Sequence, residues 1–150
     1  MSNQFSHSKI DAFRVCPRKY QFQYIERPQI EKQVAVEVFT GQVLHQVLQQ
    51  VYEVRRMNKA LPREDALALY DRGWEGAPLK ALKVNNESLA VEDFIEDGRR
   101  SLEWYYDEHQ PFDDGETLGV EEWVRLQIDP ARDLNLRGKI DRLCRHSDGS

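Results

Sequence analysis

Cysteine is scarce in this sequence, and long apolar runs are absent. The 150 residues include two cysteines, Cys16 and Cys144, too few for a disulfide framework or, by themselves, for a four-ligand metal site. No apolar stretch approaches the roughly 20 residues that span a bilayer, and the first residues do not have the pattern of a signal peptide. Internal repeats and low-complexity segments are absent too. These absences predict a soluble cytoplasmic protein, and the length suits one domain with its own core.

The formal net charge of −5 is unevenly distributed along the chain. Residues 1–32 carry six Lys or Arg against three Asp or Glu, and residues 132–146 carry five against two. Residues 86–122, in contrast, carry thirteen Asp or Glu against two Arg. Because phosphate contacts act within a Debye length of roughly 8–10 Å, a protein that is acidic overall can still bind nucleic acid with one basic face. Two interpretations stay open: a nucleic-acid-binding face, or ordinary solvated surfaces.

Hydrophobic spacing predicts four or five helices over residues 6–110. Ser6 or Ser8 can cap a short helix through Phe13, and Pro17 suits the first turn of a second helix that runs to Glu26. Residues 26–40 have the composition of a connector. Gly41 then opens an amphipathic helix, and two further helices are expected at 63–74 and 87–109.

The hydrophobic period changes from 3.6 to 2 after about residue 117. Alternating apolar residues predict strands at about 117–128 and 134–144, and Asp129-Pro130 between them indicates a turn, so the two form an antiparallel pair. Helices followed by strands indicate an α+β fold. Because two strands alone seldom form a stable sheet, we expect these to be the first strands of a larger one.

Three side chains have the chemistry of metal ligands, each with an ordinary alternative. Asp141 shares a strand face with Arg137 and Lys139, which is either a solvent-exposed face or a carboxylate presented to a hard divalent cation. His45 falls at the edge of an apolar helix face, where it is either a hydrogen-bonded residue beside the core or a nitrogen ligand. Cys16, at a helix N-terminus, is either a small buried hydrophobe or a thiolate ligand.

Three segments in a fixed order resemble a known nuclease family. The stretch SHSKIDAFRVCPRKYQFQYI resembles the opening of the RecB-like branch of the PD-(D/E)xK nuclease superfamily. GQVLHQVL resembles that family's first motif, a Gly followed four residues later by His, and LRGKIDRL resembles its second, Gly-x-x-Asp-Arg. The matching residues are Ser6, Ser8, Cys16, Pro17, Tyr20, Gly41, His45, Gly138, Asp141 and Arg142.

This resemblance implies a restriction-endonuclease-like α/β core and a metal-dependent DNA nuclease, a RecB-like exonuclease of DNA repair or recombination that acts with a helicase or another repair protein. It implies that His45 and Asp141 share Mg²⁺ or Mn²⁺. Arg137, Lys139 and Arg142 would then hold DNA phosphates, although pairing with the acidic helix at 87–109 explains them equally well. In some relatives the cysteine matching Cys16 is the first ligand of an iron–sulfur cluster, whose other ligands would require a longer chain.

The family's third motif, (D/E)-x-K, has no counterpart in these 150 residues. Glu121-Glu122 lacks the spacing to a lysine and, by the sequence pattern, the strand context. The resemblance therefore implies the N-terminal portion of a single nuclease domain, inactive alone, with an unpaired sheet edge after residue 144. Two alternatives stay open. The chain can be a non-catalytic DNA-binding or partner-docking domain derived from such a nuclease, or an unrelated helical domain in which His45 and Asp141 never meet.

Overall fold

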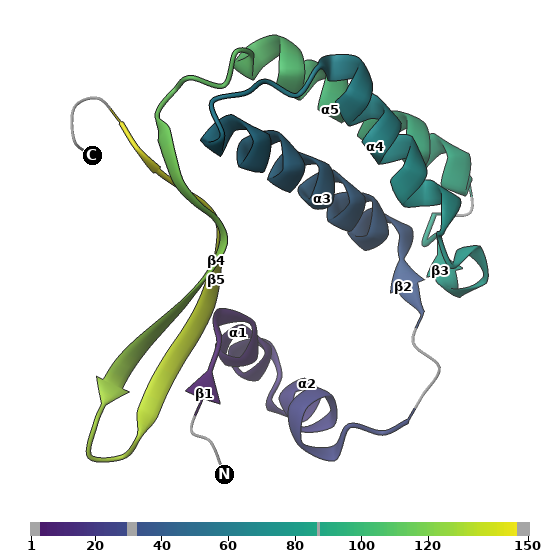
Figure 1. Ribbon diagram of the computed structural model, residues 1–150. Helices are drawn as coiled ribbons and strands as arrows, with labels where there is room; N and C mark the ends of the chain where they lie inside the picture. Colours follow the sequence, from purple (N-terminus) through teal and green to yellow (C-terminus); the bar gives the residue numbers. More distant parts are fainter. Residues whose placement is uncertain (1–3, 30–32, 87, 147–150) are drawn as a thin grey trace. The chain divides into compact units, whose positions relative to one another are not determined.

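The computed structural model describes residues 4–29, 33–86 and 88–146 (Figure 1). Its helices and strands belong to two units, each with its own internal packing. The first unit is Met1–Glu31 with Glu121–Asp141, and the second is Lys32–Val120 with Arg142–Ser150. The mixture of helices with a mixed sheet confirms the predicted α+β class. Among the helices in the described ranges, none is long and apolar enough to cross a membrane.

Three helices form the core of the second unit: α3 (Val36–Arg56), α4 (Arg63–Glu75) and α5 (Val91–His109). They lie side by side, each in contact with the other two (Figure 1). Strand β2 (Val34–Ala35) precedes α3 and pairs parallel with β3 (Leu82–Lys83), which follows the 3₁₀ turn at Leu79–Ala81. Both short strands contact α3. The largest fully buried side chains are Tyr70, Tyr106, Leu102, Val36 and Val51.

The prediction that α3 begins at Gly41 was wrong, because the helix begins at Val36. Residues 34–39 are rich in β-branched side chains, which favour extended structure in isolation. In the folded chain Val36 is completely buried in the core, and Phe39 packs its ring 4.9 Å from that of Trp74. Tertiary packing therefore outweighs local propensity and extends the helix by about one turn beyond the predicted start.

The other helix boundaries agree more closely with the sequence pattern. The helix predicted at 63–74 is observed at Arg63–Glu75, whereas the one predicted at 87–109 begins only at Val91. The later start has a local cause: the Asp93 carboxylate accepts a hydrogen bond from the backbone N–H of Ala90 at 2.7 Å and so satisfies a donor at the helix N-terminus.

The first unit combines N-terminal helices with most of a hairpin. Helix α1 (His7–Val15) is capped as predicted by Ser6, whose hydroxyl accepts the N–H of Lys9 at 3.3 Å. Helix α2 (Pro17–Tyr20) begins at Pro17, also as predicted. It continues not as a regular α-helix but as a π-helical segment, Gln21–Glu26, which ends where Arg27 adopts a left-handed conformation.

The hairpin consists of β4 (Glu116–Asp129) and β5 (Leu134–Arg145), close to the predicted ranges. The sheet order is β1-β5-β4, because the two-residue strand β1 (Gln4–Phe5) pairs parallel to β5, with Gln4 opposite Asn135. Asn135 is buried, and its amide accepts from Arg125 Nε at 3.1 Å and donates to the Asp133 carbonyl at 2.9 Å. The prediction of an unpaired sheet edge after residue 144 concerns a segment that includes residues 147–150, which lie outside the described residues.

Candidate metal centre

Two carboxylates lie together on neighbouring strands of the first unit. The nearest ligand oxygens of Glu121, on β4, and Asp141, on β5, are no more than 4.8 Å apart. The Asp141 side chain is exposed, whereas that of Glu121 is only 17% exposed. We call Glu121 and Asp141 the carboxylate pair. Two negative charges at this separation repel each other unless a cation compensates them.

Glu121 reaches this position through an unusual backbone conformation. Its φ angle is +56°, in the left-handed region that is costly for residues other than glycine, although it lies within a long strand. A residue of this kind breaks the regular alternation of a strand and redirects its side chain, an arrangement often found next to active sites.

Lys139 provides a positive charge beside the carboxylate pair. Its ammonium group forms an ion pair with Glu121 across the two strands. Lys139 lies two residues before Asp141 on β5, so both side chains leave the same face of the hairpin. The result is a cluster of two carboxylates and one ammonium within a single unit. Hard oxygen donors of this kind suit Mg²⁺ or Mn²⁺.

The sequence reasoning missed Glu121 as a site residue. The expectation that Glu121-Glu122 lacks strand context was wrong, because both residues belong to β4. Its lysine does not follow two residues later in the chain but comes from the neighbouring strand. Strand alternation alone could not identify Glu121, because its left-handed conformation interrupts that alternation. The available signal was the strand predicted at about 117–128, which includes these two acidic residues and conflicts with the expectation that they lack strand context.

His45 lies on α3 in the second unit, and its side chain is exposed. The exposure of His45 does not agree with the first of its two interpretations, a hydrogen-bonded residue beside the core. The neighbouring core positions of the helix are taken by Val43 and Val47, both buried. His45 is thus a solvent-facing imidazole whose two ring nitrogens can act as ligands.

Arg142 is held within the second unit by contacts with three residues. Its guanidinium donates two hydrogen bonds to the Asp114 carboxylate, at 3.0 and 2.8 Å, and a third to the Thr117 hydroxyl at 3.3 Å. It also lies over the Tyr52 ring at 4.0 Å. The side chain is 17% exposed. The hydrogen bonds from Arg142 lower the pKa of the Asp114 carboxyl below its usual value.

These contacts give Arg142 a structural role. The sequence left open whether its partner is DNA or the acidic helix at 87–109; the observed partner, Asp114, lies in the loop after that helix. The Arg142 contacts hold the strand residue that directly follows Asp141. We therefore describe Arg142 as a positioning residue for β5.

Two cationic side chains, Arg137 and Lys139, lie close to an exposed tryptophan. The Arg137 guanidinium lies 3.9 Å from the centre of the Trp123 ring, and the Lys139 ammonium lies 5.9 Å from it. Trp123 is 60% exposed. All three residues belong to the first unit and to the same hairpin as the carboxylate pair. The sequence reasoning identified the two cations but not the tryptophan between them.

The two cysteines lie in different units and do not form a disulfide. The Cys16 thiol caps α2 and accepts the backbone N–H of Lys19 at 3.5 Å, as expected of a polar group at a helix N-terminus. The Cys144 sulfur lies 3.7 Å from the Nε2 atom of His146. The iron–sulfur role of Cys16 stays a prediction.

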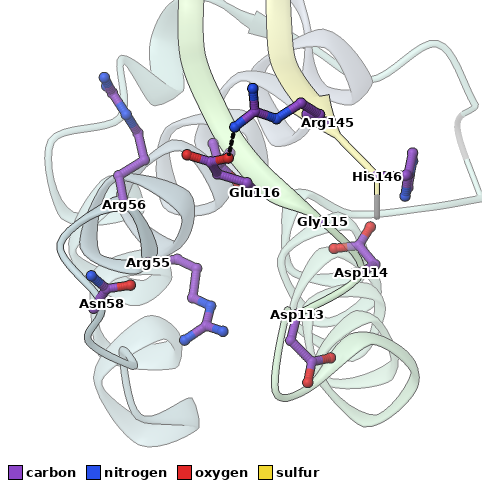
Figure 2. Close-up of a pocket in the computed structure, with 10 residues that line it drawn as sticks. Arg55, Arg56, Asn58, Asp113, Asp114, Gly115, Glu116, Arg145 and His146 are labelled. Carbon is purple, nitrogen blue, oxygen red and sulfur yellow. Dashed lines mark hydrogen bonds and ion pairs between the residues drawn. The ribbon is translucent and has the colours of Figure 1, made fainter. Parts of the chain in front are cut away.

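A polar cavity of about 690 Å³ lies in the second unit (Figure 2). It is bounded by the end of α3, by residues 113–117 and by the end of β5. Its charges have both signs and are partly paired internally, since Arg145 forms an ion pair with Glu116. The cavity therefore lacks the one-sided charge that would select an anion or a metal ion.

Comparison with known proteins gives one family. A model of the PD-(D/E)XK nuclease superfamily matches residues 4–150, nearly the whole chain. Neither the curated proteins nor the solved structures gave a match.

Proposed function

Because the chain belongs to the PD-(D/E)XK nuclease superfamily, we propose that it is the metal-binding part of a DNA nuclease that hydrolyses phosphodiester bonds. The observation that carries this proposal is the carboxylate pair with Lys139 beside it. The order of the Gly41–His45 and Gly138–Arg142 motifs supports a RecB-like exonuclease acting in DNA repair or recombination. A helicase partner and a cytoplasmic location stay predictions.

Glu121 and Asp141 are the residues we propose as oxygen ligands of Mg²⁺ or Mn²⁺, and the motif match adds His45 as a nitrogen ligand. Lys139 pairs with one of the two carboxylates, Glu121, and a divalent cation would neutralise the remaining negative charge of the pair. An ion bound there would lower the pKa of a water molecule and stabilise charge on the leaving oxygen. This chemistry is what phosphodiester hydrolysis near neutral pH requires.

Lys139 and Arg142 have separate roles in this proposal. Lys139 pairs with Glu121 at the surface of the hairpin, where its ammonium group can also contact a DNA phosphate. Arg142 does not contact substrate; it holds the end of β5 through Asp114 and Tyr52. Replacing Lys139 should therefore weaken substrate binding, whereas replacing Arg142 should act through the position of Asp141.

Metal binding by the chain tests this proposal directly. We expect titration calorimetry to show Mn²⁺ binding that falls at least tenfold in Asp141→Asn and in Glu121→Gln, because each change removes a charged ligand. Glu122→Gln is the matched control, since it alters the exposed carboxylate next to Glu121 and should leave affinity unchanged. In the complete gene product, Asp141→Asn should abolish Mg²⁺-dependent degradation of linear DNA. Equal Mn²⁺ affinity in all four proteins would place the metal elsewhere or exclude it.

The second candidate function is DNA binding without cleavage. It is favoured by one sequence observation: no Asp or Glu in these 150 residues is followed two positions later by Lys. A complete gene product that binds DNA but releases no nucleotides with Mg²⁺ or Mn²⁺ would establish this alternative. Cleavage that chelation abolishes would exclude it.

A further inference from the structure

Trp123 is an exposed aromatic side chain in a position where exposure is costly. It is 60% exposed on β4, two residues from Glu121. A large ring left in water forgoes the favourable free energy of burial and leaves its face open to a ligand. Two cations lie beside this ring. The Arg137 guanidinium covers part of the ring at 3.9 Å, which orients the indole by a cation–π contact and leaves most of the side chain open.

The tryptophan and the carboxylate pair lie on one face of the hairpin. Lys139 establishes this, because its ammonium pairs with Glu121 and also lies 5.9 Å from the Trp123 ring. Arg137, Lys139 and Asp141 alternate along β5 and therefore leave the same side of the strand. Glu121 and Trp123 are separated by roughly 7 Å along β4, a distance that one extended nucleotide can span.

We propose that Trp123 is a stacking platform for an unpaired base of single-stranded DNA, with the adjoining phosphates held by Arg137 and Lys139. This inference rests on the proposed nuclease function and specifies its substrate. A positively charged groove with an aromatic ring is the recurring way in which proteins bind single strands, because every base presents a flat face to stack. In a duplex those faces are covered by neighbouring bases. The strand next to the carboxylate pair is therefore expected to be unpaired.

Tryptophan fluorescence distinguishes this site from the rest of the chain. The protein has three tryptophans: Trp74 is buried, whereas Trp104, on α5 in the second unit, is 62% exposed and so matches Trp123 in exposure. With EDTA present, a dT oligomer of about ten nucleotides should quench the emission of the unaltered chain and of Trp104→Phe. Trp123→Phe should lose this quenching. Quenching that disappears in Trp104→Phe instead, or that is absent in the unaltered chain, overturns the proposal.

Affinity measurements test the role of the ring and of strandedness. By fluorescence anisotropy of the labelled dT oligomer, Trp123→Ala should bind roughly 10- to 100-fold more weakly, whereas Trp104→Ala should bind normally. Arg137→Gln should also weaken binding, and its effect should shrink as salt rises. A blunt duplex should bind at least about tenfold more weakly than single strands of mixed sequence. Equal affinity for both forms overturns the inference.

The outcomes separate this inference from the proposed function. Because the binding experiments use EDTA, they do not depend on the metal site. If Trp123→Ala cleaves DNA and binds the dT oligomer normally, the stacking proposal is wrong and the proposed nuclease function stands. If bases stack on Trp123 but Mn²⁺ does not bind at Glu121 and Asp141, the proposed metal site is wrong and the stacking proposal stands. Circular dichroism of each variant checks that the substitution leaves the fold intact.

Discussion

At the scale of single residues, Arg142 shows how a planar guanidinium can make contacts that a lysine ammonium could not. It makes two parallel hydrogen bonds to Asp114 and stacks on Tyr52 at the same time. Tyr52 is itself fixed, because its hydroxyl hydrogen-bonds with that of Tyr105 at 2.6 Å, and its burial raises the pKa of the Tyr52 phenol well above the usual value. These contacts fix the strand residue that directly follows Asp141 in the chain.

The Asp114–Arg142 pair should make stability depend on acid pH. The hydrogen bonds from Arg142 lower the pKa of Asp114 in the folded state. The pair therefore stabilises the fold above the unfolded pKa near 4, and this contribution disappears as pH falls through the lower folded value. Since Asp114 is half exposed, we expect a contribution of only about 0.5–1 kcal/mol.

Urea unfolding between pH 2 and 7 measures this contribution. Asp114→Asn should be less stable than the unaltered chain at pH 7, and the difference should vanish near pH 2, where both carboxyl and amide are neutral. Asp113→Asn is the control, because the adjacent carboxylate makes no hydrogen bond with Arg142 among those described. A constant difference between the Asp114→Asn and unaltered proteins across the whole pH range would contradict the prediction.

At the scale of elements, the helices of the second unit approach one another closely at Gly98. A Cβ atom added to Gly98, on α5, would lie 2.7 Å from Thr40 Cγ2 on α3 and would also overlap the Tyr70 hydroxyl on α4. Thr40 and Tyr70 have little room to move. The Thr40 hydroxyl donates to the Val36 carbonyl at 2.9 Å, and the Tyr70 hydroxyl donates to the Ile95 carbonyl at 3.0 Å.

We expect Gly98→Ala to lower the free energy of unfolding by about 1–3 kcal/mol, because overpacking outweighs the gain in helix propensity of about 1 kcal/mol. Gly41→Ala is the matched control inside α3. Among the described residues, no atom outside the neighbouring turns of α3 lies within 4 Å of a Cβ added at Gly41. The Gly41→Ala substitution should therefore raise the free energy of unfolding by about 0.5–1 kcal/mol. Denaturant unfolding measures both. An increase in stability for both variants would show that Tyr70 and Thr40 can move aside.

Elements with a sustained period could be predicted from the sequence, whereas features that depend on a distant partner could not. Apolar residues repeat over three turns or more inside α3 and over several alternations in both hairpin strands. The predicted ranges of these elements therefore agree with the structure. Strand β1 has two residues and exists only through pairing with β5. The first turn of α3 depends on burial of Val36. Such short or tertiary features leave no periodic signal.

The candidate site shows the same division. His45 and Asp141 could be selected because they stand in motifs. Glu121 could not, because its position depends on a left-handed backbone angle within a strand and on a lysine from the strand beside it. Trp123 was hidden for a related reason: alternation identifies which face a residue occupies but not which cations lie over its ring.

At the scale of the whole molecule, the chain passes between its two units within the hairpin, at residues 120–121 on β4 and 141–142 on β5. The proposed ligands are divided in the same way, since Glu121 and Asp141 belong to the first unit and His45 to the second. If all three bind one ion, that ion restrains both units. Metal binding would then stabilise α3 as well as the hairpin.

Amide hydrogen exchange measures this coupling. With Mn²⁺ at 100 times its Kd, exchange limited by release of the ion should slow by up to about 100-fold, equivalent to about 2.7 kcal/mol. We expect the slowing around Asp141 on β5 and around His45 on α3. In His45→Ala it should persist on β5 but vanish on α3, whereas Gln46→Ala, which alters the next exposed residue of the same helix, should keep both. Slowing confined to β5 in the unaltered chain would remove His45 from the ligand set and leave Glu121 and Asp141 as the metal-binding residues.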